Sequence, residues 1–544
     1  MTNISILMNI KKAFNLLGRV LPKKATRLFV EHNQNYFPIP NSRQSRNPKI
    51  LMELNNMHSG HIAYSYLVNE LSVEHNAEIV AYVPFAFSNI AAKLAYKIRC
   101  ILNIDEIGVY KSFGTTDFMT IKISKLHRER SRVLFSEIYP KIQSKWDIEA
   151  ISIHGIWVGD LIYDTYLQRF HTPTIDKLSD EFKNFFLESI ELFLFWEDYF
   201  NSHDVRAMAL SHCVYNIAIP LRIAVEKNIP AYQATLAHVY RMSKKNLFAY
   251  NDFFDFRERF IALPEEVKRI GLAEAKQRID RRFSGEVGVN MSYSTKTAYS
   301  HIRHARLIRE SSRKKILIAT HCFFDSPHSY GNNIFPDFYE WLDFLGEISE
   351  ITNYDWYIKT HPDYLDGTKQ IIDSFVERYP KFTLLPASSS HHQIIEEGIN
   401  VALTVYGTIA FEYAALGIPV INNSLNNPHI AYDFNVHSKS VDDYRSILLD
   451  LDNLKLSINK EQVYEYYYMK HIHGTNDIFF NNYDATIIEI GGYSNQCTPI
   501  IYEKWMDEWS VEKHKSIIHV LQCFIRSIDF RMDCRHLDYT ISID

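Results

Sequence analysis

The sequence predicts an α/β protein with two parallel-sheet domains, and three observations support this fold class. The chain has 544 residues, which is more than a single ordinary hydrophobic core accommodates. In residues 48–85 and again in 314–423, short apolar runs alternate with stretches of helical periodicity, and parallel strands need such crossover connections. Polar clusters follow the apolar runs at the same end each time. Ligands of parallel sheets bind at the carboxyl ends of the strands, so these clusters are candidates for one site.

The first domain is expected over residues 48–250. It begins with a strand in KILMELNN (49–56), a helix in AYSYLVNELSVEH (63–75) and a second strand in AEIVAYVPF (77–85). Gly60 stands alone between the first strand and the helix, so the segment lacks the glycine-rich fingerprint of dinucleotide-binding proteins. A later strand over 205–210 ends at Ser211 and His212. These two residues either cap and pack against the next helix or face the space between the domains.

An acidic pair lies in HGIWVGDLIYDTYLQRF (154–170). Asp160 and Asp164 are four residues apart, so on a helix they share one face. Like charges held together cost stability unless something uses them. The pair is therefore either a solvated acidic face or a functional one.

Composition divides the rest of the chain. Residues 251–313 are highly charged and poor in strand signals, which predicts a helical connector. The second domain is expected over 314–473. A helical extension, 474–544, is expected to pack back on the first domain.

The N-terminal segment, residues 1–47, interleaves Lys and Arg with apolar residues, whereas a signal peptide has its charges before the apolar region. A basic amphipathic helix here either packs on its own domain or lies on an anionic membrane surface. In the second case the lysines that contact lipid are Lys11, Lys12, Lys23 and Lys24. No apolar run approaches the ~20 residues of a membrane span.

The second strand of the second domain, DWYIKTHP, ends in a group of polar residues. Lys359 and His361 alternate with Thr360, so both can face the same side. Pro362 fixes the turn and removes a competing donor. Two cationic or hydrogen-bonding side chains at a strand end suit a phosphate group that must leave as an anion.

The most specific signal is YGTIAFEYAALGIPVI (406–421). Gly407 permits a tight turn from strand to helix, and Thr408 begins a helix whose free backbone N–H groups favour a phosphate. Glu412 lies one turn further on the same face, where a carboxylate can accept hydrogen bonds from ribose hydroxyls. These residues predict a nucleotide-phosphate cradle without a Walker lysine, and the alternative is an ordinary β–α turn with a surface glutamate.

The stretch 316–423 resembles the nucleotide-binding half of bacterial capsule and surface-polysaccharide glycosyltransferases of the GT-B fold, in which two Rossmann-like domains face a cleft. It is most similar to Kdo transferases, with pseudaminic and sialic acid transferases as relatives. Their HP motif, Gly-Ser/Thr turn and glutamate match His361, Pro362, Gly407, Thr408 and Glu412. The resemblance implies a CMP-activated acidic sugar as donor, a glycan or glycolipid acceptor, and no metal or other cofactor.

The resemblance also implies a retaining reaction, in which a carboxylate of the second domain forms a covalent sugar adduct. The matching position is Asp325, which lies between His321 and His328, whose positive charge would keep the carboxylate ionised. Asp160 or Asp164 would supply the acid/base group or orient the acceptor. The alternative for the loop is a capped turn with two surface histidines.

Composition limits the partners and the location. The net charge of -5 argues against a dedicated nucleic-acid binder. Six scattered cysteines without a CxxC pair fit a reducing compartment and provide no zinc or disulfide framework. We expect a cytoplasmic protein at the inner face of the inner membrane, where a lipid-linked acceptor is anchored.

Three other functions stay open at this point. One is a GT-B transferase that uses a UDP-sugar, a GDP-sugar or a CDP-polyol. A metal-dependent hydrolase would need ligands from the histidines and the carboxylate near the strand ends, namely His321, Asp325, His328, His361, His391 and His392. A non-catalytic glycan-binding scaffold would need no phosphate cradle.

Overall fold

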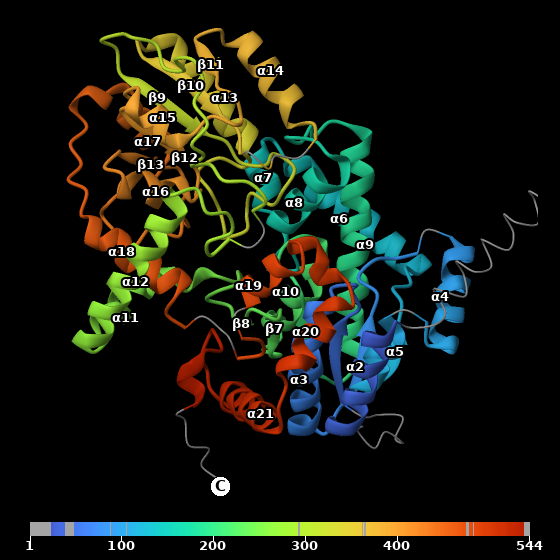
Figure 1. Cartoon of the computed structure of the whole chain (residues 1–544). Coiled ribbons are helices and arrows are strands. Elements are labelled where there is room, and N and C mark those ends of the chain that lie inside the picture. Colours follow the sequence, from blue (N-terminus) through green and yellow to red (C-terminus); the bar gives the residue numbers. More distant parts are fainter. Residues whose placement is uncertain are drawn as a thin grey trace, which may run out of the picture.

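The computed structural model describes residues 23–38, 48–87, 89–104, 106–291, 294–361, 363, 366–474, 478–481 and 483–537. Within these residues the chain forms two six-stranded sheets, each covered by helices (Figure 1). A two-stranded hairpin, β4 (Ser152–Ile153) with β5 (Ile156–Trp157), precedes the helix that carries the acidic pair. No helix in the described part of the chain combines the length and apolarity that crossing a bilayer requires.

The first sheet has the strand order β3-β2-β1-β6-β7-β8. All neighbouring strands are parallel except β7 and β8, which are antiparallel. Its strands are β1 (Lys49–Glu53), β2 (Glu78–Tyr82), β3 (Thr115–Met119), β6 (Val205–Leu210), β7 (Ala231–Ala234) and β8 (Val239–Met242). Both faces are buried: Leu51 packs into one core, and Ile50 and Met52 into another. Burial on both faces explains why the strands are continuous apolar runs.

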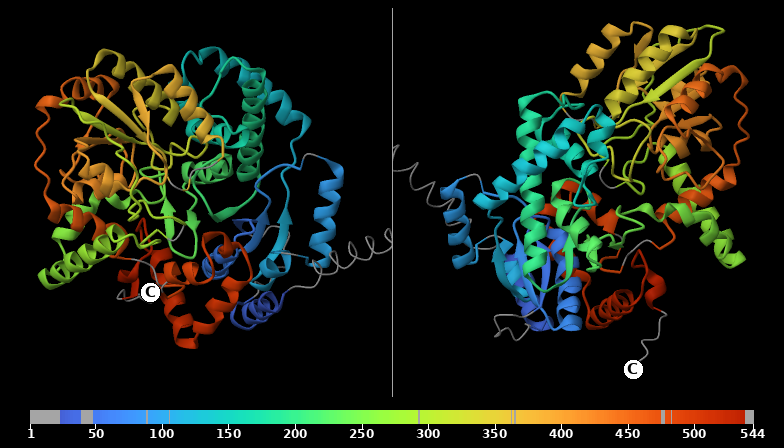
Figure 2. Two further views of the ribbon diagram at one scale, coloured as in Figure 1. Left: turned by 45° about the horizontal axis from the view of Figure 1, so that its top comes forward. Right: turned by 180° about the vertical axis from the view of Figure 1, so that it is seen from behind.

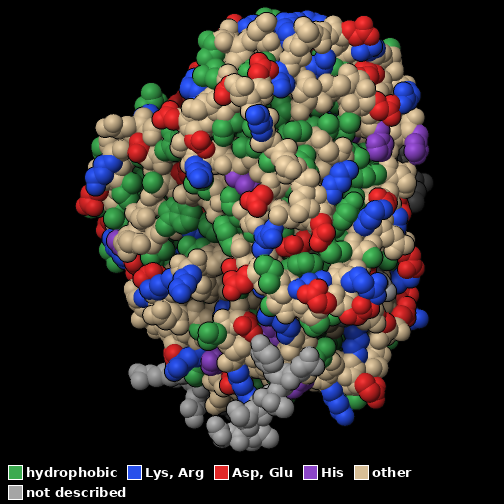
Figure 3. Space-filling model, turned by 90° about the vertical axis from the view of Figure 1, so that its left-hand side faces the viewer, with side chains coloured by type: hydrophobic (Ala, Val, Ile, Leu, Met, Phe, Trp, Pro, Cys, Tyr) green, Lys and Arg blue, Asp and Glu red, His purple; other side chains and the backbone are tan. Residues whose placement is uncertain are grey.

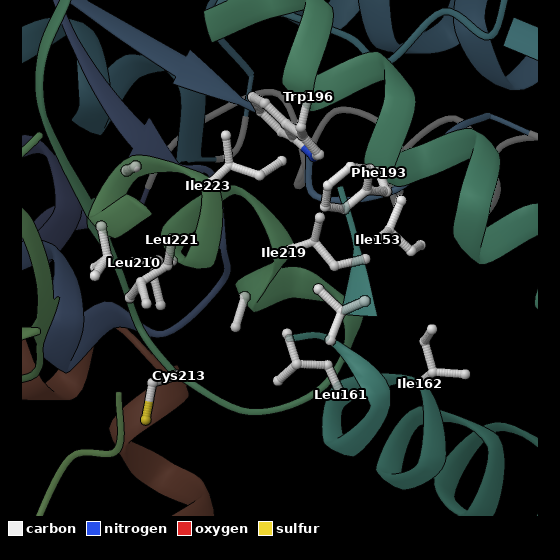
Figure 4. Packing of buried hydrophobic residues seen from close by; sticks show 14 of the residues in the cluster. Ile153, Leu161, Ile162, Phe193, Trp196, Leu210, Cys213, Ile219, Leu221 and Ile223 are labelled. Carbon is white, nitrogen blue, oxygen red and sulfur yellow. The ribbon is translucent and has the colours of Figure 1, made fainter. Parts of the chain in front are cut away.

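Helices cover both faces of the first sheet, as the two further views show (Figure 2). On one face, α8 (Gly159–Phe170), α9 (Asp180–Ser202) and α10 (Ile219–Glu226) pack through Leu161, Phe193, Trp196 and Ile219 (Figure 4). The other helices of this half are α2 (Lys24–Tyr36), α3 (His58–His75), α4 (Ile90–Leu102), α5 (Glu106–Ser112), α6 (Lys125–Ile138) and α7 (Lys145–Glu149).

The C-terminal helices lie against the first domain. Helix α3 contacts β1, β2, β6 and β7 on one side and α20 (Ile500–Glu508) and α21 (Val511–Arg526) on the other. This double cover explains why α3 is buried all round and is not amphipathic. Helix α21 begins at Ser510, whose side chain accepts a hydrogen bond from the Lys513 N–H.

The second sheet repeats the architecture of the first. Its strand order is β11-β10-β9-β12-β13-β14, and every neighbouring pair is parallel. The strands are β9 (Lys315–Ala319), β10 (Asp355–Lys359), β11 (Phe382–Leu384), β12 (Val401–Thr404), β13 (Val420–Asn422) and β14 (Val436–His437). The helices are α13 (Phe338–Ile351), α14 (Thr368–Arg378), α15 (His391–Glu396), α16 (Ile409–Ala415) and α17 (Val441–Leu449).

The connector between the sheets is helical only in its first half. Helices α11 (Phe256–Ile261) and α12 (Glu265–Phe283) pack against α18 (Lys460–His471). The helical prediction is wrong beyond Phe283, because the described residues among 284–314 contain neither helix nor strand. Gly285 and Gly288 adopt φ of +91° and +82°, where other residues are strained, and so end the helical path.

Candidate active site

The topology locates the site. In each sheet, the first strand in sequence lies beside the fourth, so the chain reverses direction across the sheet between β1 and β6 and between β9 and β12. Ligands of doubly wound sheets bind outside the carboxyl ends of the strands at this switch point. The predicted residues Ser211, His212, His321 and Asp325 follow β6 and β9, and Gly407 follows β12. These predicted residues therefore lie at the carboxyl ends of their strands, on the edge of each sheet that contains the switch point.

At the first switch point, a buried carboxylate organises Ser211 and His212. Glu53 Oε2 accepts hydrogen bonds from the Ser211 N–H at 2.7 Å and from its hydroxyl at 2.7 Å. His212 Nδ1 lies 2.8 Å from the same hydroxyl, and the imidazole is exposed. Because the Ser211 proton goes to Glu53, the serine oxygen accepts from Nδ1–H, which leaves Nε2 as a proton acceptor. Glu53, which ends β1, was not among the predicted site residues, although it lies within the predicted strand 49–56.

Asp325 lies exposed in the loop after β9 and touches the opposite domain. Its Oδ1 accepts hydrogen bonds from the Tyr215 hydroxyl at 2.6 Å and from the Ser326 N–H at 2.8 Å. Burial, and next the Asp325 charge, raise the pKa of Tyr215, so the phenol remains a donor. Tyr215 has φ of 60° and ψ of 173°, a region that costs a non-glycine residue roughly 1–3 kcal/mol. Backbone strain of this kind is concentrated at functional sites. No sequence pattern had predicted Tyr215 as a site residue.

His321 braces the turn after β12 as a neutral side chain. Burial, reinforced by the charge of His361, lowers its pKa to about 3. Its Nε2 accepts from the Val405 N–H at 3.2 Å and lies 3.1 Å from Thr404 Oγ1. The prediction that His321 keeps Asp325 ionised by positive charge is therefore wrong. Tyr215 and the Ser326 N–H provide hydrogen bonds to the carboxylate instead.

His328, Asp164 and Asp160 are buried inside the protein. His328 Nδ1 lies 2.5 Å from Asp164 Oδ1, and its Nε2 lies 3.3 Å from Glu149 Oε1. Burial alone would lower the pKa of His328, but Asp164 and then Glu149 raise it well above its ordinary value. Burial raises the pKa of Asp164 to about 6, although His328 opposes the shift. This charged group joins α7 and α8 of the first domain to the β9–α13 loop of the second.

Asp160 has a separate partner. Its Oδ2 lies 2.5 Å from Arg222 Nη2, with each side chain only 1% exposed. The guanidinium also stacks over the Trp157 ring at 4.8 Å. The acidic pair does share a helix face, as predicted, but that face is covered by protein. The catalytic roles expected of Asp160, Asp164 and His328 have no support in this geometry.

Lys359 and His361 occupy the end of β10, as predicted. Lys359 is buried, and its Nζ contacts the carbonyl oxygens of Ala387 at 3.3 Å and Thr360 at 3.5 Å. No described carboxylate lies within ion-pair distance of it, and burial lowers its pKa to about 8. His361 is exposed, and its Nδ1 accepts from the Asp363 N–H at 3.1 Å. Pro362 lies outside the described residues.

The turn before α16 requires glycine. A Cβ on Gly407 would lie 2.7 Å from Thr404 Oγ1, which itself accepts a hydrogen bond from the Gly407 N–H. Thr408 caps α16 without a side-chain hydrogen bond. Helix α16 has only 7 residues, so its dipole is weaker than a long helix would provide. A phosphate here would depend chiefly on Lys359, His361 and the backbone N–H groups.

Glu412 is buried and already has partners. Its Oε1 lies 2.5 Å from Arg282 Nη2, and its Oε2 accepts from the Tyr299 hydroxyl at 2.9 Å. Both partners belong to residues 251–313, which were predicted only as a helical connector. In this arrangement the carboxylate is not open to a ribose, and the ribose contact predicted for Glu412 requires Arg282 and Tyr299 to move.

A cavity of about 520 Å³ opens between the end of the first domain, α12, α18 and α19 (Tyr483–Glu489). Its charged lining comprises Arg278, Arg281, Lys470 and Arg531 with Glu286 and Asp484, and burial lowers the pKa of its two histidines, His238 and His471. Lys470 Nζ lies 5.5 Å from the Tyr250 ring centre and 5.8 Å from that of Tyr330, and burial lowers its pKa to about 8. The Tyr330 ring lies 5.2 Å from Tyr406, whose hydroxyl donates to the Ser326 carbonyl. The cavity is thus linked through tyrosines to the Asp325 loop.

The histidines considered as metal ligands have separate partners. Besides the contacts above, His391 Nδ1 pairs with the Tyr413 hydroxyl at 2.8 Å, and His392 Nε2 lies 2.8 Å from the Phe283 carbonyl oxygen. Across the described ranges, no three His, Cys, Asp or Glu side chains converge as a metal site. The hydrolase alternative therefore lacks a ligand set in this part of the chain.

Comparisons with known proteins give matches only among solved structures. No protein-family model and no curated protein sequence match the chain. Thermosulfurimonas dismutans KpsC, beta Kdo 2,4 transferase, is 11% identical over 48% of this chain and 79% of that chain, with a TM-score of 0.28. The KpsC beta Kdo 2,7 transferase of that organism is 12% identical over 50% and 79%, with a TM-score of 0.30. UDP-GlcNAc 2-epimerase of Methanocaldococcus jannaschii is 12% identical over 76% and 97%, with a TM-score of 0.24.

Kdo transferases are thus among the structures to which this chain is similar, as the sequence resemblance predicted. The predicted GT-B class is also confirmed, since the chain has two Rossmann-like sheets whose carboxyl-end loops meet. The fold class rests on the two sheets of this chain, because the structures compared have identities of 12% or less and TM-scores of 0.30 or less.

Proposed function

We propose that this protein is a glycosyltransferase that moves an acidic sugar, Kdo, pseudaminic acid or a related sugar, from a CMP-sugar to a capsule- or lipopolysaccharide-type glycan. The observation that carries the proposal is the setting of Asp325. It is an exposed carboxylate at the switch point of one sheet, held by Tyr215 from the other domain. The cavity that Tyr330 and Tyr406 connect to the Asp325 loop has more cationic than acidic side chains, which suits the carboxylate of an acidic sugar or an anionic acceptor.

Lys359 and His361 are the proposed phosphate contacts of the donor. A buried lysine without a carboxylate partner is costly unless an anion completes its environment. His361 adds an exposed donor or acceptor beside it, and Gly407 lets the backbone approach closely. These groups stabilise the negative charge of the departing CMP without a metal ion.

Asp325 is the proposed nucleophile of a retaining transfer. Tyr215 and the Ser326 N–H both bind Oδ1, which leaves Oδ2 to attack the anomeric carbon as the bond to CMP breaks. An acceptor hydroxyl then displaces Asp325, so two inversions retain the configuration. His212 Nε2, set as an acceptor by the Glu53–Ser211 chain, takes the proton of that hydroxyl.

Donor binding is tested by thermal stabilisation with CMP, UDP, GDP and CDP-polyols, because a ligand that binds only the native state raises its stability. We expect CMP to give the largest shift. His361→Ala should weaken CMP binding about 10- to 100-fold, as expected for a lost charge-assisted contact. Lys381→Ala is a control, because Lys381 contacts backbone carbonyls as Lys359 does but precedes β11, at the amino end of the strands. Equal CMP affinity of the His361→Ala variant and the wild type would remove the donor site from the proposal.

The covalent step is tested with donor and no acceptor. Wild-type protein should gain the mass of one sugar on the peptide that contains Asp325. Asp325→Ala should lose transfer but keep CMP affinity, because its side chain acts on the sugar. Inversion at the anomeric carbon, or an adduct on another carboxylate, would overturn the role of Asp325.

A further inference from the structure

Helix α4 of the first domain exposes its apolar side chains to solvent. Ile90 is 86% exposed, Leu94 57%, Ile98 46% and Ile101 77%. Their spacing of four, four and three residues places them in one stripe along the helix. Phe85 and Leu102, 60% and 58% exposed, lie just outside this stripe in sequence. Soluble helices normally turn such a stripe toward a core, and exposed contiguous apolar surface marks a site of interaction.

The helix is nonetheless well formed. Asn89 caps its start by accepting a hydrogen bond from the Ala92 N–H at 2.8 Å, and Asn103 ends it with φ of 54°. Its buried side is small: Tyr96 is the one buried residue, and its ring packs 5.2 Å from that of Phe87. The fold therefore anchors α4 by Tyr96 and turns the larger apolar face outward.

The charge around α4 has one dominant sign. The helix sequence, IAAKLAYKIRCIL, contains lysine and arginine but no acidic residue. Beside it lies a cavity of about 570 Å³, between α4 and the strand β3, lined by Lys93, Lys97, Lys111 and Lys122 with Asp117 as its acidic residue. Lys111 is tied to the Asn103 side chain at 2.5 Å. Among the described residues, the side-chain amines of Lys93, Lys97 and Lys122 have no hydrogen-bond or ion-pair partner.

We propose that α4 and this lysine-lined cavity form a docking surface for an anionic phospholipid bilayer. The apolar stripe enters the boundary between headgroups and acyl chains, and the cavity receives a lipid phosphate. A second copy of the chain fits less well, because two copies of one cationic surface repel each other across a two-fold interface. Helix α4 lies at the outer edge of the first domain, away from the second (Figures 1 and 2), so docking leaves the cleft accessible.

The opposite side of the molecule has a different distribution of charged side chains. The face in Figure 3, which is turned away from α4, carries basic and acidic side chains interspersed with one another. The residues of the α4 surface are also distinct in sequence from the basic N-terminal segment, of which residues 1–22 and 39–47 lie outside the described residues. Variants of the full chain therefore test α4 while leaving that segment unchanged.

The test is flotation with vesicles of phosphatidylcholine, alone or mixed in equal amounts with phosphatidylglycerol. Leu94→Gln/Ile98→Gln/Ile101→Gln should reduce binding to the mixed vesicles about tenfold or more, since three apolar side chains no longer enter the lipid. Lys97→Glu/Lys122→Glu should remove the preference for phosphatidylglycerol. Leu126→Gln/Val133→Gln on α6 is the matched control, because both side chains are 57% exposed on another helix of the domain.

Three outcomes overturn the proposal. The α4 triple variant could bind the mixed vesicles as the wild type does, or the wild type could show no preference for the anionic lipid. Light scattering could instead show a wild-type dimer that the triple variant abolishes, in which case a second copy occupies the surface. None of these outcomes concerns CMP binding. The membrane-docking proposal and the proposed transferase activity can therefore be refuted independently of each other.

Discussion

At the scale of single residues, Tyr215 is the side chain on which the setting of Asp325 depends. Tyr215→Phe keeps the ring and removes the hydroxyl that donates to Oδ1 at 2.6 Å. A hydrogen bond to a charged group contributes about 1.5–3 kcal/mol, so turnover should fall about 10- to 100-fold. CMP affinity should stay unchanged, because the hydroxyl contacts no predicted nucleotide residue. A normal turnover in this variant would show that Tyr215 serves only the domain contact.

Residue spacing predicted positions in the site better than it predicted partners. Ser211, His361 and Gly407 lie at the carboxyl ends of their strands, because period and turn chemistry fix where a strand stops. The i, i+4 spacing of the acidic pair correctly defined a helix face but not what covers it. The partner of Asp160 is 62 residues away and that of Asp164 is 164 residues away. Local patterns contain no information about such distant contacts.

At the scale of elements, the connector after α12 controls access to Glu412. Tyr299→Phe should free Oε2 of Glu412 and tighten CMP binding about 2- to 10-fold, since one hydrogen bond that competes with the ribose is lost. Glu412→Gln should weaken CMP binding, because the amide accepts fewer hydrogen bonds than the carboxylate. Isothermal titration measures both changes. If neither variant alters CMP affinity, Glu412 acts only as the partner of Arg282.

The connector also shows why some elements could be predicted from the sequence and others could not. Strands buried on both faces, such as β6, and the α13 helix were visible as apolar runs and amphipathic periods. Residues 294–304 have no period, and their conformation is set by contacts with the second domain, such as the His391 N–H bond to the Ala298 carbonyl oxygen. Structure of that kind follows from the finished fold and not from local preference.

At the scale of the whole molecule, polar contacts from the loop after β9, the first strand of the second domain, join the two domains. Asp337 caps α13 and also accepts from the Tyr163 hydroxyl at 2.5 Å and the Thr174 hydroxyl at 2.6 Å. The Asp325, His328 and Asp337 contacts all come from one loop, 320–337. The catalytic carboxylate proposed above is therefore on the same segment that sets the distance between the domains, and domain opening would move Asp325 relative to Tyr215.

The buried His328 gives this domain contact a dependence on pH. Its pKa in the folded protein is raised above the unfolded value of about 6.5. Its contribution to stability is thus fully present below pH ~6.5 and is lost as pH rises toward the folded pKa. Over that window the free energy of unfolding should fall by up to about 1.4 kcal/mol per pH unit from this proton. Glu149, Asp164 and the Tyr163 ring are the groups that surround it.

His328→Gln should remove that slope and destabilise the protein by about 3–5 kcal/mol below pH 6.5, because two buried carboxylates lose their cation. Denaturant unfolding followed at a series of pH values measures both effects. His154→Gln is the control, since His154 also contacts a carboxylate, Glu197, but at the exposed surface, where an ion pair contributes about 0–1 kcal/mol. A wild-type slope that persists in His328→Gln would mean that the proton is bound elsewhere. The contact of His328 with Asp164 and Glu149 would then be neutral and hydrogen-bonded, and its stability would not depend on pH through His328.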